Sequence, residues 1–134
     1  MVRPLLFHLL ACLGASAATP GFQVLDSSFL SIKINAVNAD GSVFVGTGET
    51  SPGQYEAFVW RQEDGFTPLG TLPGGFNSYG KGVSANGQHV VGHVLSLTDG
   101  YPTPFIWNAD QGMVSLPRMP GCNQATACDV SNDG

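Results

Sequence analysis

The feature that most constrains the fold of this chain is a segment that recurs every 46 or 47 residues. A turn of the pattern Val-x-(Ala/Asn)-Asx-Gly occurs three times, ending at Gly41, Gly87 and Gly134. A Phe-x-Trp pair recurs at an offset of 47 residues, and its members are Phe58, Trp60, Phe105 and Trp107. Because so many positions match at one offset, the chain is built from tandem copies of one unit.

Each copy is predicted to contain four short β-strands. In the first copy they cover residues 32–37, 42–48, 55–61 and 66–69, where apolar and polar residues alternate between Gly-rich turns. Asp40-Gly41 joins the first two strands, and Asx-Gly predicts a type I′ hairpin turn with positive φ at both residues. The second copy repeats this order after Asn86-Gly87, with strands at 89–95, 103–107 and 113–116.

Four-stranded units with a period of about 40–50 residues are typical of β-propeller blades. The recurring Phe and Trp side chains are then expected to fill the space between adjacent blades, contributing roughly 2–3 kcal/mol each. A β-sandwich with the same residues in its core is the alternative. Propellers close with about four to eight blades. Because the chain holds two copies and the opening of a third, we expect a fragment of a longer protein.

The first 17 residues are predicted to be a secretory signal peptide. Arg3 precedes an apolar stretch at residues 4–14, and Ala15-Ser16-Ala17 is a small-x-small cleavage site. The apolar stretch is too short to span a bilayer. A rival is lipidation of Cys12 after Leu9-Leu10-Ala11, but this would leave a signal of only 11 residues. We favour cleavage near Ala17, followed by a lead-in at 18–31, repeat 1 at 32–78, repeat 2 at 79–125 and the start of repeat 3 at 126–134.

Composition and charge argue against several classes of partner. The formal net charge is -5, and removal of Arg3 with the signal leaves 4 basic and 10 acidic residues, or 4 − 10 = -6. The remaining basic residues are scattered, which argues against nucleic acid or an anionic membrane as partner; they are Lys33, Arg61, Lys81 and Arg118. No later stretch is apolar enough to span a membrane. The 18 Gly and 9 Pro residues favour an all-β chain with many turns.

Four motifs together resemble the bacterial extracellular HAF-repeat family, over residues 32–134. They are Gly82-Val83-Ser84-Ala85-Asn86-Gly87, Val90-Val91-Gly92, Ala57-Phe58-Val59-Trp60, and the Leu-Gly-Thr-Leu-Pro-Gly-Gly run at 69–75. The His-Ala-Phe triplet that names the family reads Glu56-Ala57-Phe58 here, and Thr103-Pro104-Phe105 in the second copy. Both copies therefore lack its histidine. The resemblance implies a secreted, propeller-like repeat protein of the bacterial envelope and brings no particular activity with it.

Two cysteines are candidates for a structural disulfide. Cys122 and Cys128 flank the loop 123–127, and a secreted chain meets an oxidising compartment. Closing so short a loop contributes roughly 2–3 kcal/mol in the loop-entropy model. The alternatives are a pair of free thiols and a metal or redox site. Cys12 is removed with the signal peptide.

No other residues form a recognisable catalytic, cofactor or metal site. His89 and His93 are four residues apart, which on a strand separates them by more than about 10 Å. Glu49, Glu56, Glu63, Asp64, Asp99 and Asp110 could supply a glycosidase pair, but nothing distinguishes any two of them. We therefore predict no catalytic residue, no cofactor and no metal.

The first functional hypothesis is a non-enzymatic extracellular scaffold or binding module. Loops that differ between copies would carry recognition of a glycan or a cell-surface protein; they are residues 49–54, 98–103 and 123–127. Two alternatives stay open. One is part of an extracellular propeller enzyme acting on carbohydrate, and the other is the structural passenger repeat of a surface adhesin.

Alkylation with and without prior reduction tests the predicted bridge. We expect the reduced and alkylated mature protein to be heavier by two labels, at Cys122 and Cys128, because bridged sulfur atoms react only after reduction. Equal masses in the two samples would contradict the bridge.

Overall fold

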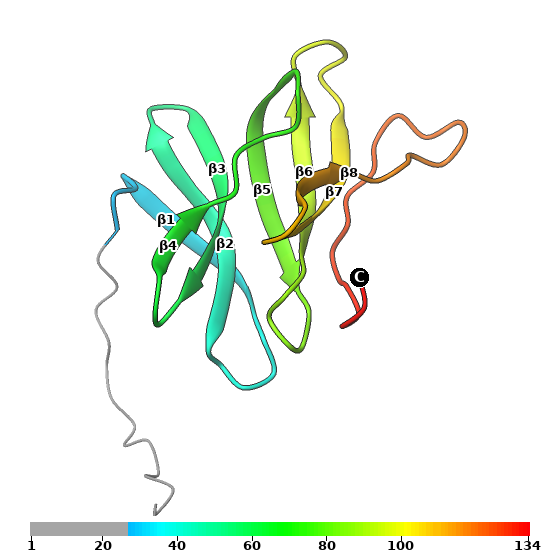
Figure 1. Ribbon diagram of the computed structural model, residues 1–134. Helices are drawn as coiled ribbons and strands as arrows, with labels where there is room; N and C mark the ends of the chain where they lie inside the picture. The colour runs from blue at the N-terminus through cyan, green and yellow to red at the C-terminus, as the bar shows by residue number, and fades with distance from the viewer. Residues whose placement is uncertain (1–26) are drawn as a thin grey trace, which may run out of the picture.

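The computed structural model describes residues 27–134, in which all regular secondary structure is β-strand (Figure 1). Each strand predicted for the two copies is present, with ends that differ by at most three residues. No helix that could cross a membrane occurs among these residues. The predicted signal peptide and residues 18–26 of the lead-in lie outside the described residues.

The eight strands form two antiparallel sheets of four, one for each copy. The first sheet has the order β1-β2-β3-β4, with β1 Ser31–Val37, β2 Val43–Ser51, β3 Gln54–Arg61 and β4 Gly65–Pro68. The second has the order β5-β6-β7-β8, with β5 Gly75–Val83, β6 Val90–Ser96, β7 Pro102–Asn108 and β8 Gly112–Ser115. The prediction of an all-β chain of tandem four-stranded antiparallel units is confirmed.

The two sheets pack face to face, with β5 lying against β2 and β3 (Figure 1). The core between them contains buried Val45 and Val59 from the first sheet and Val90, Val94 and Phe105 from the second. Valine dominates because β-branched side chains fit a pleated surface. The core therefore belongs to the contact between copies and not to either copy alone.

Glycine allows the two backbones to approach closely at one crossing. A Cβ atom on Gly80 of β5 would lie 2.7 Å from the carbonyl oxygen of Gly46 in β2 and 2.8 Å from a methyl carbon of Val45. Real Cβ contacts are longer than this, so any larger residue at position 80 would push the sheets apart. Gly80 thus sets the distance between the two sheets at this crossing.

The recurring aromatic residues fill the space between the sheets only in the second copy. Phe105 and Trp107 pack in the inter-sheet core, whereas Phe58 and Trp60 lie on the opposite face of the first sheet. There Phe58 contacts the ring of Phe29, with centroids 5.5 Å apart, and Trp60 stacks on the strand-β2 residue Phe44 at 4.9 Å. The expectation for the first copy is corrected because each copy turns its aromatic face toward the preceding segment, which here is the lead-in.

The hairpin turns differ from the predicted type I′ geometry. Gly41 has φ of 77°, but no residue other than glycine has positive φ among the described residues, Asp40 included. Gly41 N donates to Asn38 O at 3.2 Å, which makes a type I turn that ends in a left-handed glycine. The side chain of Asn38 explains this, because its Oδ1 accepts from Val43 N at 3.0 Å and closes a longer loop.

Replacing Phe105 with alanine tests the inter-sheet core. Phe105 is 0% exposed, and a Phe-to-Ala change at such a site lowers the free energy of unfolding by about 3–5 kcal/mol. The matched control is Phe76→Ala, since Phe76 is 45% exposed and should cost about 1 kcal/mol or less. Urea denaturation measures both, and equal losses would contradict a core at this interface.

Candidate functional site

Equivalent turns of successive copies are bonded directly to one another. Ala39 N donates to Ala85 O at 3.2 Å, and Asn86 N donates to Asn132 Oδ1 at 2.9 Å. The partners in each pair lie 46 residues apart. This equals the offset between the first two copies, whereas Asn132 lies one residue before Asp133, the repeat position of Asn86. The turns of all three copies therefore contact one another in the order of the copies.

The C-terminal segment lies on the second sheet much as β5 lies on the first (Figure 1). Ala127 N donates to Gly92 O at 3.4 Å, and these residues occupy the repeat positions of Gly80 and Gly46. The third turn also forms, because Gly134 N donates to Ser131 O at 3.3 Å. The contact between successive copies thus occurs twice in the described residues.

Cys122 and Cys128 are free and exposed, so the structure does not contain the predicted disulfide. Cys122 belongs to a turn in which its N–H donates to Met119 O at 3.0 Å. The backbone of Cys128 is placed differently, with its carbonyl oxygen against Gly82 of β5. The two cysteines are therefore in contact with different neighbours.

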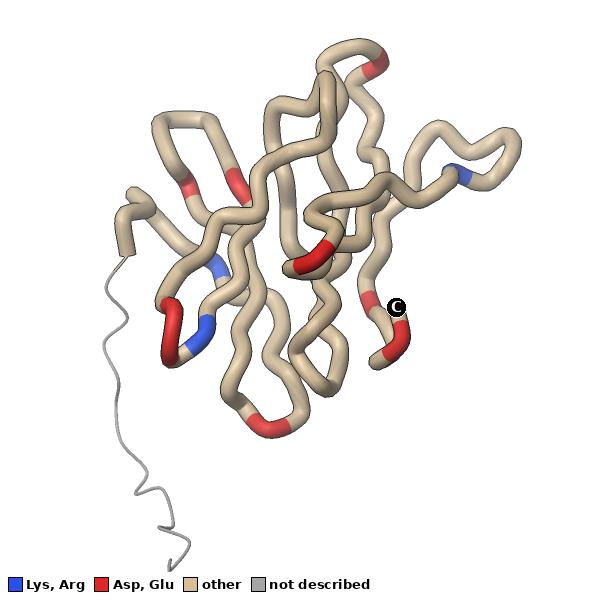
Figure 2. The backbone as a smooth tube through the Cα atoms, viewed as in Figure 1, with Lys and Arg blue, Asp and Glu red and all other residues tan. Residues whose placement is uncertain are grey.

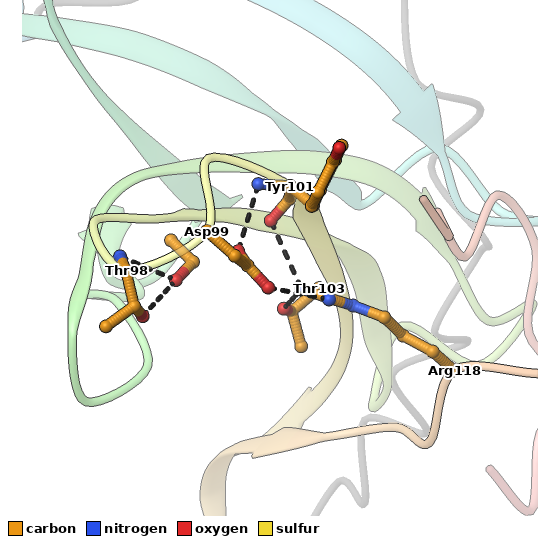
Figure 3. Close-up of polar contacts among 6 residues, drawn as sticks. Thr98, Asp99, Tyr101, Thr103 and Arg118 are labelled. Carbon is orange, nitrogen blue, oxygen red and sulfur yellow. Dashed lines mark hydrogen bonds and ion pairs between the residues drawn. The ribbon is translucent and has the colours of Figure 1, made fainter. Parts of the chain in front are cut away.

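The loop between β6 and β7 is held by one arginine (Figure 3). Arg118 forms an ion pair with Asp99 at 2.9 Å and donates to the carbonyl oxygen of Tyr101 at 3.3 Å. It also donates to the hydroxyl of Thr103. Asp99 in turn accepts from Tyr101 N at 3.0 Å. The repeat position of Arg118 in the first copy is Thr71, so this arrangement is specific to the second copy.

The hydrogen bond from Arg118 lowers the pKa of Asp99 below its ordinary value of 3.8, and the backbone N–H of Tyr101 adds to the effect. The carboxylate therefore stays charged at neutral pH. The ion pair between Arg118 and Asp99 orders the loop between β6 and β7, which the sequence predicts to differ between copies.

A cavity of about 270 Å³ lies beside the open edges of β1 and β5. Its lining residues come from both copies and include Lys33, Thr47, Tyr55, Tyr79 and Lys81. The rings of Tyr55 and Tyr79 stack with centroids 5.9 Å apart. The hydroxyl of Thr47 is buried and has no hydrogen-bond partner in the described part of the protein. Reasoning from the sequence missed this site because its residues come from strands that become neighbours only through stacking.

The two histidines do not share a strand face. His89 precedes β6, whereas His93 lies within it and stacks on Tyr79 with centroids 4.9 Å apart. Burial lowers the pKa of His93, and the nearby charge of Lys81 adds to this. Within residues 27–134, no three His, Cys, Asp or Glu side chains gather in a group that could hold a metal ion.

Charged residues of both signs are spread over turns and strands along the chain (Figure 2). Arg61 donates to Gly87 O at 2.8 Å, and Arg118 binds the loop between β6 and β7, so both arginines make contacts inside the protein. The two lysines, in contrast, meet at the cavity beside β1 and β5.

Comparisons with protein-family models, with curated proteins and with solved structures found no match. The function has to be inferred from the contacts and charges of the chain itself.

Replacing Arg118 with alanine is expected to raise the pKa of Asp99 toward 3.8, because the guanidinium is the largest cause of its depression. A depressed folded-state pKa means that this contribution to loop order is present above the unfolded-state pKa and is lost as the pH falls through the folded-state value. An NMR titration of the Asp99 carboxyl group measures the shift.

The control for this titration is Arg61→Ala, because Arg61 bonds the carbonyl oxygen of Gly87 and does not contact Asp99. It should leave the Asp99 curve unchanged. A curve for Arg118→Ala that matches the unaltered protein would show that the ion pair does not hold the carboxylate.

Proposed function

We propose that this chain is a secreted repeat protein of the HAF type. Its four-stranded sheets would be β-propeller-like blades, and it would act as a non-enzymatic extracellular scaffold or binding module. Support comes from the motifs at 57–60, 69–75, 82–87 and 90–92, from the leader-like N-terminus, and from the way successive copies stack.

The observation that carries the proposal is the repeated bonding of equivalent turns. Ala39 with Ala85, and Asn86 with Asn132, are contacts between the same turn of successive copies. Each sheet uses one face toward the preceding copy and the other face toward the following copy, which is a head-to-tail interface. Interfaces of this kind propagate until they close into a ring or extend as an open stack. A ring of such sheets is a propeller.

Loops outside this frame differ between copies, which favours recognition as the function. The loop at 49–54 is fastened by its own Glu49, whose Oε1 accepts from Gly53 N at 3.1 Å. The corresponding loop of the second copy is fastened instead by Arg118. A constant frame that presents differently ordered loops suits binding of a glycan or a cell-surface protein.

The test uses the chain expressed with its own N-terminus and recovered from the medium. We expect a mature N-terminus at Ala18, saturable binding on a glycan array or to intact cells, and no product from a panel of polysaccharides. Retention of the chain inside the cell would contradict secretion. Steady release of shortened saccharides would contradict a non-enzymatic role and favour the propeller enzyme.

A further inference from the structure

We propose that the cavity beside the open edges of β1 and β5 binds a carboxylated sugar, such as a uronate residue of an acidic glycan. This inference rests on the proposed binding function and narrows it to one site and one class of ligand. Four features of the cavity carry it: its size, its aromatic wall, its two lysines and a buried hydroxyl without a partner.

The size of the cavity suits a single sugar ring. Its volume of about 270 Å³ lies just below the range of roughly 300–1,000 Å³ that is typical of pockets for larger ligands. The walls come from β1, β2 and β3 of the first copy and from β5 of the second. Both β1 and β5 are edge strands of their sheets, so the cavity lies where the edges of two successive copies meet.

One wall is a column of aromatic rings. Tyr55 and Tyr79 stack at 5.9 Å with an angle of 28° between ring planes, and His93 continues the column beyond Tyr79. Buried Asn77 positions the column, since its Oδ1 accepts from Tyr55 N at 2.9 Å and its amide donates to Tyr79 Oη at 3.4 Å. Because Tyr79 lies between Tyr55 and His93, its faces are covered, and its ring edge and hydroxyl are the parts that would contact a sugar.

The charge of the cavity is opposite to that of the chain. The protein has a net charge of -5 and only two lysines, Lys33 and Lys81, and both line this cavity. In the described range neither lysine takes part in an ion pair. Glu49 is the one carboxylate of the lining, and its oxygens accept from Ser31 Oγ at 3.0 Å and Gly53 N at 3.1 Å. Two ammonium groups and one carboxylate leave a positive site that attracts an anion.

Thr47 supplies an independent indication of a ligand. Its side chain is on the cavity wall and only 8% exposed, and its hydroxyl lacks a partner among residues 27–134. A buried hydroxyl without a hydrogen bond is unfavourable. The oxygen is closed to solvent in the free protein, so a bound group would gain this hydrogen bond when the Thr47 side chain turns toward the cavity. The neighbouring amide of Asn35 is already committed, because it donates to Gly80 O at 2.6 Å. A sugar hydroxyl fits the position of Thr47, and a carboxylate fits the two lysines.

The test is a titration of the secreted chain with D-galacturonate, in which binding is measured by calorimetry and by NMR. A single sugar should bind with a dissociation constant on the order of 1 mM or tighter. Signals of Lys33, Lys81 and Tyr79 should shift together on binding. D-galactose, which lacks the carboxylate, should bind about tenfold more weakly. This measurement needs no variant and so does not depend on the folding of one.

Variants then assign the site. Lys33→Gln and Lys81→Gln should each weaken galacturonate binding about tenfold, and the matched control Arg61→Gln should leave it unchanged. Thr47→Val removes the unpartnered hydroxyl while keeping the shape. It should weaken binding and should leave the melting temperature of the free protein unchanged or raised, which separates a role in binding from a role in folding.

The remaining outcomes would overturn the inference. No binding of galacturonate, or equal binding by the lysine variants, would remove the cavity as the site. Equal affinity for acetate or for inorganic phosphate would show an anion site without preference for a sugar. Glycan binding on the array that survives all three substitutions would refute this inference and leave the proposed binding function intact, whereas release of shortened saccharides would refute the proposed function itself.

Discussion

The close approach of one sheet to the next is the constraint on which the rest of the structure depends. It occurs where Gly80 crosses the carbonyl oxygen of Gly46, and it brings Val45, Val90 and Phe105 into one core. Neither sheet could bury this surface alone, because a single four-stranded sheet has two faces and no layer to cover them. The stability of the fold is therefore a property of the contact between copies.

This contact has a direction. Each sheet turns the phenylalanine of its Phe-x-Trp pair toward the segment before it, and the first sheet presents Val45 and Val59 to the copy after it. The second sheet turns Phe105 toward the first, and the first turns Phe58 toward the lead-in, where Phe29 covers it. The same residues can form a directional contact between each copy and the next. The loops and the strand edges can then vary in sequence while the stacked sheets stay the same.

The candidate site illustrates what such variation can produce. Tyr55 and Lys33 belong to the first copy, while Tyr79 and Lys81 belong to the second. Lys33 and Tyr79 occupy the same repeat position but differ in chemistry, and the repeat positions of Tyr55 and Lys81 hold Pro102 and Asn35. The cavity therefore exists only once the copies have stacked. The chemistry of the cavity is not a property of the repeated unit. The motifs that define the repeat therefore do not predict it.

Local chemistry in the sequence determined the strands and the positions of the turns, since period-two alternation and Asx-Gly pairs act over a few residues. Long-range contacts decided the rest. The type I′ turn was wrong because the side chain of Asn38 bonds across the loop to Val43. The place of Phe58 depended on the direction of stacking, which periodicity does not encode. Lys33 and Lys81 are 48 residues apart in the sequence. They line one cavity because the stacking of the second sheet on the first brings β5 beside β1. No local sequence pattern predicts that these two strands become neighbours.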